Sequence, residues 1–171
     1  MKQAIAGVTP AEVKECTTMT VWPSVVAYPT GTFLGKLYSI RWPDLYIFRL
    51  GNLIALASIP HALLLYFCRI FPAIGLKYTL TNRRVVVIKG IKGIEDKSIE
   101  LDRFDAIEVE VKPGQEWFHA GDLVFKMGGT ETFRLVGVSR PEAFRAICMH
   151  AHRAYTGVKK ALAQELAAAA T

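Results

Sequence analysis

The sequence predicts an α+β protein in which a single transmembrane helix precedes an antiparallel β-barrel or sandwich that a C-terminal amphipathic helix closes. Three observations predict this class. An uncharged apolar segment covers residues 50–68, strand-like alternation begins at residue 76, and a helical apolar period begins after residue 139. A chain of 171 residues has room for one membrane anchor and one modest globular core.

The overall composition agrees with this plan. Hydrophobic residues make up 51% of the chain, and its formal net charge of +6 is compatible with an anionic partner. The three cysteines, Cys16, Cys68 and Cys148, lie far apart, which excludes a disulfide framework or a CxxC metal site and favours a reducing compartment. The first 20 residues contain charges and no apolar core, so we expect no cleavable signal peptide.

The apolar segment Leu50–Cys68 contains no Asp, Glu, Lys or Arg. As one continuous helix, its 19 residues would be roughly 28 Å long, close to the hydrocarbon thickness of a bilayer. We therefore predict a transmembrane helix at residues 49–71, with aromatic and basic residues at its two membrane interfaces. These interface residues are Trp42, Tyr46, Arg49, Arg69 and Phe71.

Pro60 and His61 lie near the middle of this segment. Pro60 predicts a kink, and the alternative is a re-entrant hairpin that turns at Pro60, although each half is short for a crossing. His61 either packs against a partner helix or a backbone carbonyl, or marks an intramembrane functional site. Five Lys and Arg residues follow the segment closely and three precede it, which favours a cytoplasmic C-terminal domain.

Residues 1–48 are predicted to be an interfacial or partner-contacting segment. Residues 21–45 mix aromatic side chains with Pro23, Pro29 and Pro43, and these prolines exclude one long helix. The alternative is a flexible tail, but such tails seldom contain so many aromatic residues. The candidate partner contacts are the aromatic residues of this segment, His61 and an aromatic pair farther along the chain: Trp22, Tyr28, Phe33, Tyr38, His61, Trp117 and Phe118.

From residue 76 the apolar period is two, which is typical of strands. Two strands meet at a Thr81-Asn82 turn, and the second ends at Lys89-Gly90. A later strand alternates Ile107, Val109 and Val111 with charged residues, and Gly128-Gly129 joins two more strands as a hairpin turn. The segment therefore predicts six or seven short antiparallel strands.

A helix follows the strands. Ser139 is the expected N-cap, with Pro141 in the first turn and Glu142 at capping-box spacing. Apolar residues then recur every three or four positions, and Gly157 is a candidate interruption. We place the globular domain at residues 76–157 and a helical, alanine-rich tail at residues 158–171. The apolar face consists of Phe144, Ile147, Cys148, Ala151, Tyr155 and Val158.

The run Tyr78–Val85 (YTLTNRRV), followed by Gly90, resembles the bacterial pleckstrin-homology-like (PH-like) family, in which a Y-x-L-T-x-x-R strand opens the domain directly after membrane helices. Gly121-Asp122-Leu123 is similar to a later strand opening, and Phe133–Phe144 is similar to the closing strand and helix entry. The resemblance covers roughly residues 77–156, about half of the chain.

This resemblance implies a PH-like fold and a single-pass protein of the bacterial inner (cytoplasmic) membrane with its C-terminal domain in the cytoplasm. It implies a fold more than an activity, because PH-like domains are scaffolds for lipid, peptide or protein contacts. Family members often carry two membrane helices before the domain. Only one is predicted here, which leaves the side of the membrane for residues 1–48 open.

The resemblance also implies that basic residues near the first strand loops contact lipid head groups, as they do in eukaryotic PH domains. Independently, each Lys or Arg near an anionic leaflet gains about 1 kcal/mol. The alternatives are an ordinary mixed-charge surface, because Asp and Glu are interspersed, or a role for the family's arginine in the fold. The candidate lipid-binding residues are Arg83, Arg84, Lys89, Lys92 and Lys97.

Other chemistry has little support in the sequence. His150 and His152 project from different sides of a helix and have no nearby Cys or carboxylate to complete a metal site. His119, beside the Trp117-Phe118 pair, lies in a segment that either docks on a membrane or partner or covers a sheet edge. Neither a catalytic motif nor a phosphate-binding loop is found. We therefore predict no enzyme activity, cofactor, metal or nucleic-acid partner.

Two functions remain. The first is a non-catalytic accessory or structural subunit of a larger membrane complex, for example a respiratory or photosynthetic one, whose partners are other membrane-protein subunits. The aromatic, proline-containing segment before the anchor favours this interpretation. The second is a free-standing, membrane-anchored PH-like module that binds anionic phospholipid or a peptide.

Overall fold

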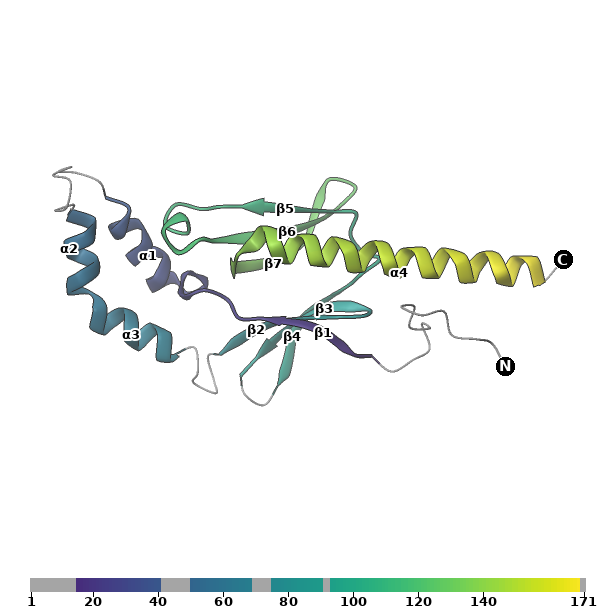
Figure 1. The fold of residues 1–171 in the computed structure, drawn as a ribbon, viewed down its shortest axis with the longest axis horizontal. Coiled ribbons are helices and arrows are strands. Elements are labelled where there is room, and N and C mark those ends of the chain that lie inside the picture. The colour runs from purple at the N-terminus through teal and green to yellow at the C-terminus, as the bar shows by residue number, and fades with distance from the viewer. Residues whose placement is uncertain (1–14, 41–49, 69–74, 91–92, 170–171) are drawn as a thin grey trace.

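The computed structural model describes residues 15–40, 50–68, 75–90 and 93–169. Within them the chain forms two antiparallel sheets and a long C-terminal helix. A group of shorter helices lies at one end of the molecule, and the C-terminal end of the long helix lies at the other (Figure 1). The prediction of an α+β class with strands followed by a C-terminal helix is confirmed.

The first sheet contains four strands in the order β1 (Thr17–Val21), β2 (Leu76–Thr81), β3 (Arg84–Lys89) and β4 (Ile94–Glu100). The tight β2–β3 turn is held by the Thr81 hydroxyl, which accepts hydrogen bonds from the backbone N–H groups of Arg83 and Arg84. β1 comes from the segment that was predicted to be interfacial, yet it pairs with β2 across more than 50 intervening residues.

The second sheet contains β5 (Ala106–Glu110), β6 (Ala120–Met127) and β7 (Thr130–Ser139). Gly128 and Gly129 form the β6–β7 turn, and both have positive φ angles, 57° and 85°, as a two-residue hairpin turn requires. The predicted turn at this pair is confirmed.

The two sheets pack face to face around one apolar core. Phe104, Phe125 and Leu123 are almost fully buried in it, as are Leu80 and Leu135. The end of β1 continues onto the second sheet, where Pro23 bridges Val138 and the Ser24 N–H donates to the carbonyl oxygen of Gly137 over 2.7 Å. The sheets meet at this corner but are not closed into a barrel, so the sandwich form of the prediction is the correct one.

Helix α4 (Pro141–Ala169) covers the second sheet through β5 and β6 and then extends well beyond the sandwich (Figure 1). Phe144 and Cys148 are buried in the core, and His152 donates from Nδ1 to the carbonyl oxygen of Leu101 over 2.5 Å. The predicted capping box is not formed, because α4 begins at Pro141 and the Ser139 hydroxyl lies 3.5 Å from the carbonyl oxygen of Trp22. Gly157 does not interrupt the helix.

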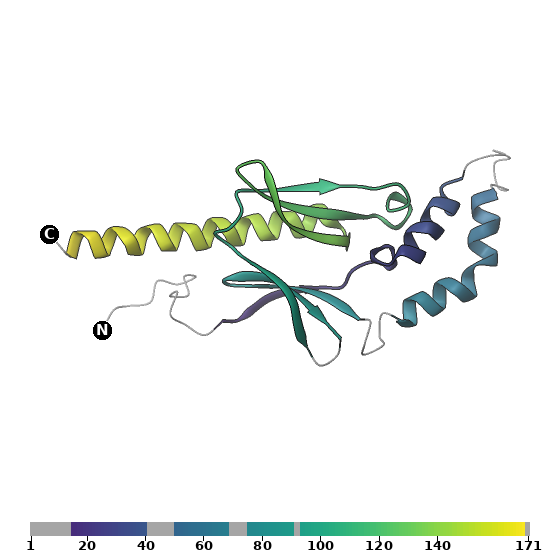
Figure 2. The same cartoon turned by 180° about the vertical axis from the view of Figure 1, so that it is seen from behind.

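A helical insertion separates β1 from β2. It comprises η1 (Val25–Ala27), α1 (Pro29–Tyr38), α2 (Leu50–Ala57) and α3 (Ile59–Cys68), and both views place it at one end of the sandwich (Figures 1 and 2). The strands predicted from residue 76 onward are therefore joined in the first sheet by β1, which precedes this insertion in the chain.

Within residues 50–68 the apolar segment forms two helices, which corrects the prediction of one continuous helix at residues 49–71. α2 and α3 join at Ser58 with a marked change of direction, without folding back into a hairpin (Figure 2). Pro60 is the second residue of α3 and has no N–H for the carbonyl group of Leu56, so the helical hydrogen-bond ladder is interrupted there. None of the helices in the described parts of the chain is long and apolar enough to span a bilayer.

Candidate membrane-docking surface

Helices α2 and α3 expose an unusual number of large apolar side chains. Their exposed fractions range from 46% at Leu53 to 66% at Leu56, and no charged residue occurs between Leu50 and Cys68. Soluble monomers rarely expose a contiguous apolar area of this kind. We call this set the α2–α3 apolar surface; it consists of Leu53, Leu56, Ile59, Leu63, Leu64, Tyr66 and Phe67.

The opposite side of α2 packs on α1, and α3 reaches the same cluster through Leu65. Leu65 of α3 is 8% exposed and contacts Leu34 and Tyr38 of α1, and Ile54 of α2 joins the same cluster. The Tyr38 hydroxyl forms a short hydrogen bond with the hydroxyl of Ser58, at the bend between α2 and α3. One side of the bent pair is therefore fixed against α1, while the α2–α3 apolar surface stays open.

An aromatic cluster joins α1 to the sandwich. The ring of Tyr38 lies 4.8 Å from that of Trp117 and 6.0 Å from that of Phe118, measured between centroids. Both aromatic residues belong to η2 (Glu116–Phe118), the short helix between β5 and β6. The pair packs on Tyr38 of α1, and Trp117 remains 46% exposed. Docking on a membrane or partner therefore stays a prediction.

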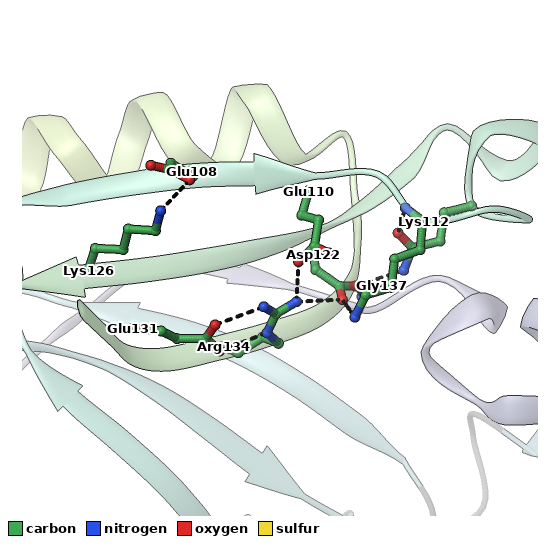
Figure 3. Close-up of polar contacts among 9 residues, drawn as sticks. Glu108, Glu110, Lys112, Asp122, Lys126, Glu131, Arg134 and Gly137 are labelled. Atoms are coloured by element: carbon green, nitrogen blue, oxygen red, sulfur yellow. Dashed lines mark hydrogen bonds and ion pairs between the residues drawn. The ribbon is translucent and has the colours of Figure 1, made fainter. Parts of the chain in front are cut away.

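A buried carboxylate holds the loop that carries η2. Asp122 of β6 is fully buried, and its oxygens accept hydrogen bonds from Lys112 Nζ (2.7 Å), Gln115 Nε2 (2.7 Å) and the Gly137 N–H (2.9 Å). Arg134 Nη1 lies 3.3 Å from the same carboxylate, as Figure 3 shows. Burial alone would raise the pKa of Asp122, but the bonds from Lys112, Gly137 and Gln115 outweigh it and lower that pKa below its ordinary value.

The network of Asp122 fixes η2 through Gln115, which is 1% exposed. The side-chain oxygen of Gln115 accepts from the Lys112 N–H over 2.9 Å, and its carbonyl oxygen accepts from the N–H groups of Phe118 (3.1 Å) and Ala120 (3.2 Å). The position of Trp117 and Phe118 is thus set from inside the second sheet. The sequence pattern contained Gly121-Asp122-Leu123, but nothing in it revealed these partners.

Two basic residues lie at the end of the first sheet that is nearest to α3. Lys77 of β2 faces Ile88 of β3, and Lys89 pairs with Leu76, so both lysines are at the same end of the β2–β3 hairpin, on opposite faces of the sheet. Both views place the start of β2 beside the end of α3 (Figures 1 and 2). Lys89 was a predicted lipid contact, whereas Lys77 was not, because only the strand register shows that the two lie at the same end of the hairpin.

The predicted lipid contacts do not form one patch in the described parts of the chain. Arg83 and Arg84 lie at the opposite end of the hairpin from Lys89, about 17 Å away at 3.3 Å per residue. Lys97 lies in the middle of β4 opposite Val87, and Lys92 lies outside the described residues. Lipid binding by these residues stays a prediction.

Arg84 has a role in the fold that the alternative interpretation anticipated. Its guanidinium pairs with Glu15 at 2.8 Å and with Glu95 at 2.9 Å across the outer face of the first sheet. The hydrogen bond from Arg84 lowers the pKa of Glu15. With two carboxylates already bound, Arg84 is a poorer site for a lipid phosphate than Lys89, for which no ion pair is found within the described part of the chain.

The remaining predicted contacts have mixed outcomes. Trp22 (46%) and Phe33 (63%) are exposed, Tyr28 is half-buried, and Tyr38 is 6% exposed because it fills the α1 cluster. His61 is exposed on α3. The predicted interface residues Trp42, Tyr46, Arg49, Arg69 and Phe71 lie outside the described residues. Among the described residues, no group of three or more His, Cys, Asp and Glu side chains is arranged to hold a metal ion.

Comparison with known proteins gives one family. The model of the bacterial PH domain family matches residues 30–152, well over half of the chain. The match begins within α1 and includes the rest of the helical insertion, the other six described strands and the first part of α4. No curated protein and no solved structure matches the chain. The chain therefore belongs to the bacterial PH domain family.

Proposed function

We infer that this protein is a non-catalytic membrane-docking module, in which the bent helix pair α2 and α3 inserts into one leaflet and holds the PH-like sandwich at an anionic bilayer surface. The observation that carries this proposal is the α2–α3 apolar surface, seven large side chains at least 46% exposed on a segment without charge. A lipid surface buries such an area without needing a complementary protein.

The size of the effect is sufficient for stable docking. Burying a half-exposed leucine-sized side chain contributes roughly 1 to 1.5 kcal/mol, so seven contribute on the order of 7 to 10 kcal/mol before the entropy of docking is subtracted. The geometry favours insertion into one leaflet. α2 has 8 residues and α3 has 10, which makes them about 12 and 15 Å long, each about half of the hydrocarbon thickness.

An accessory subunit of a larger membrane complex would use the same surface against other helices, and that role stays a prediction. Gentle detergent extraction of native membranes, followed by size separation and mass spectrometry, distinguishes the two functions. Migration at the mass of the single chain supports the docking module. Comigration with a large stoichiometric complex favours the subunit and contradicts a free-standing module.

The proposal predicts that vesicle binding depends on anionic lipid, because Lys77 and Lys89 attract it. We expect the double variant Lys77→Gln, Lys89→Gln to bind anionic vesicles about 30-fold more weakly, because each lysine near an anionic leaflet contributes about 1 kcal/mol. Binding of the full chain is measured by vesicle co-sedimentation, with phosphatidylglycerol-containing and pure phosphatidylcholine vesicles compared.

The matched control is Arg153→Gln, Lys160→Gln, which removes the same charge from two exposed positions on α4. We expect this control to lose much less affinity, because screening at physiological salt limits the effect of charges farther than about 8 Å from the surface. Equal losses in the two variants would mean that net charge, and not the end of the β2–β3 hairpin, attracts the protein.

A further inference from the structure

We propose that the groove between the free edges of β4 and β7 binds an extended peptide segment of a partner protein, which adds to β4 as a further strand. The partner is defined by its chemistry: a short, proline-free segment with apolar side chains at alternate positions. This site is separate from the α2–α3 apolar surface, and the inference does not depend on the docking of those helices to a membrane.

The groove consists of two adjoining cavities of about 590 and 400 Å³. Thr132 and Phe133 of β7 line both cavities, and residues 97–100 of β4 form the opposite wall. Both views place the β6–β7 turn, beside which the groove begins, toward the C-terminal end of α4 and away from α2 and α3 (Figures 1 and 2). The groove is therefore accessible to a partner while α2 and α3 are docked.

Both walls of the groove are edge strands. β4 is the last strand of the first sheet and β7 is the last strand of the second, and among the described residues neither pairs with a further strand along the groove. At the far end of β7 the two sheets are joined, because Pro23 bridges Val138 and the Ser24 N–H donates to the carbonyl oxygen of Gly137. An open edge without such a connection is a template for pairing with another chain.

The register of β3 and β4 shows which backbone groups face the groove. The N–H of Leu101, directly after β4, donates to the carbonyl oxygen of Arg83 over 2.8 Å. Hydrogen-bonded pairs alternate along an antiparallel ladder, so the backbone groups of Ser98 and Glu100 point away from β3. The carbonyl oxygen of Glu100 already accepts from the Arg103 N–H over 3.1 Å. The N–H and C=O of Ser98 and the N–H of Glu100 therefore face the groove, where the backbone of an extended peptide supplies matching groups.

The floor of the groove is apolar. Ile99 is 7% exposed and belongs to the core, Phe133 is half-buried against that core, and Met127 is 47% exposed. Because Ile99 points inward, its neighbours Ser98 and Glu100 point to the outer face of the sheet. Peptide residues directly opposite these two also point outward, and the residues between them point to the apolar floor. The groove therefore selects a segment in which polar and apolar side chains alternate.

A single strand suits this groove better than a second copy of the sheet. β7 stands opposite β4, so the second sheet restricts the space beside the β4 edge to one extended chain. Charged residues at positions 95–97 and the register shift between Val87 and Ile88 discourage pairing at the start of β4. The remaining wall, residues 97–100, is about 13 Å long, so a short segment of the partner is sufficient.

The test uses a fluorescein-labelled peptide in which threonine and valine alternate, with a lysine at each end for solubility. Its binding to the full chain is measured by fluorescence anisotropy without vesicles, and we expect a dissociation constant on the order of 10 to 100 μM. Two isomers carry N-methyl groups on either the threonine or the valine amides. The threonine isomer should bind at least about tenfold more weakly, because its methyl groups replace the N–H groups that face β4, and the valine isomer should stay within about threefold.

A variant pair tests the protein side of the same contact. Ser98→Pro removes an N–H that faces the groove and takes no bond from the β3–β4 ladder, so we expect at least about tenfold weaker binding. Ser98→Ala removes the same hydroxyl but keeps the N–H, and its affinity should stay within about twofold. Should Ser98→Pro fold poorly by circular dichroism, the two methylated isomers answer the question with the wild-type chain.

Three results would overturn the inference. They are a peptide that does not bind, equal binding of the two isomers, and a dimer of the chain that Ser98→Pro dissociates. The dimer, detected by size-exclusion chromatography with light scattering, would mean that a second copy occupies the β4 edge. None of these results touches the docking function, which is measured separately by vesicle co-sedimentation.

Discussion

The double variant Leu56→Ser, Leu63→Ser is expected to bind anionic vesicles about 100-fold more weakly than the wild-type chain. These side chains are 66% and 50% exposed, and each loses most of its apolar area on substitution. A loss of about 1.5 kcal/mol for each leucine gives about 3 kcal/mol in total, which corresponds to roughly 100-fold in affinity. Co-sedimentation over a range of lipid concentrations measures the change.

A matched pair on α4 serves as the control. Leu162 (40%) and Leu166 (72%) are also exposed on a helix, and the variant Leu162→Ser, Leu166→Ser makes the same chemical change away from the docking helices. We expect less than a threefold change for this pair, because an exposed leucine outside the membrane contact contributes little. An equal loss in both pairs, or an unchanged affinity of the first pair, would contradict docking through α2 and α3.

The apolar segment shows what local sequence can and cannot predict. Residues 50–68 contain no charge, their helical state was predictable from the sequence, and helices are observed there. A kink at Pro60 was predicted, but its extent was not, because a proline near the middle of an apolar run is compatible with a kinked span or a re-entrant turn. What decides here is the position of Pro60 in the first turn of α3, together with the bond between Tyr38 and Ser58.

The strands from residue 76 onward were predictable because their alternation and turn residues are local signals. β1 was not, because its assignment depends on pairing with β2, more than 50 residues later in the chain. Its sequence, TTMTV, has only a weak alternation, and its first residues are exposed. The helical insertion thus separates β1 from the rest of its sheet, and no short window of sequence contains both parts.

The candidate site was only partly predictable for the same reason. Exposed Phe33 and Trp117 were predicted contacts, but the role of Tyr38 as the buried link between α1, the bend and η2 depends on tertiary packing. Lys77 and Lys89 are brought to the same end of the first sheet only through the register of β2 and β3. Asp122 has no local signature, since its partners come from the loop after β5 and from β7.

The second large effect concerns this carboxylate. We expect Asp122→Ala to lower the free energy of unfolding by about 2 to 5 kcal/mol, because the buried Gln115 amide and Gly137 N–H lose their common acceptor and the partly exposed Lys112 loses its ion pair. Urea unfolding followed by circular dichroism measures this loss. The control is Asp96→Ala in β4, an exposed carboxylate, for which we expect less than about 0.5 kcal/mol.

The same network makes a pH dependence whose sign is fixed by the lowered pKa of Asp122. An aspartate in the unfolded chain titrates near pH 3.9, so the stabilisation is fully present above about pH 4 and is lost as the pH falls through the lower folded pKa. The variant Asp122→Asn cannot titrate, so its stability difference from the wild type should shrink as the pH is lowered from 6 toward 3. A difference that stays constant over this range would show that the carboxylate is not held in its charged form. In that case the ion pair between Lys112 and Asp122 would contribute little to stability, and the hydrogen bonds from Gln115 and the Gly137 N–H would carry the contribution of Asp122.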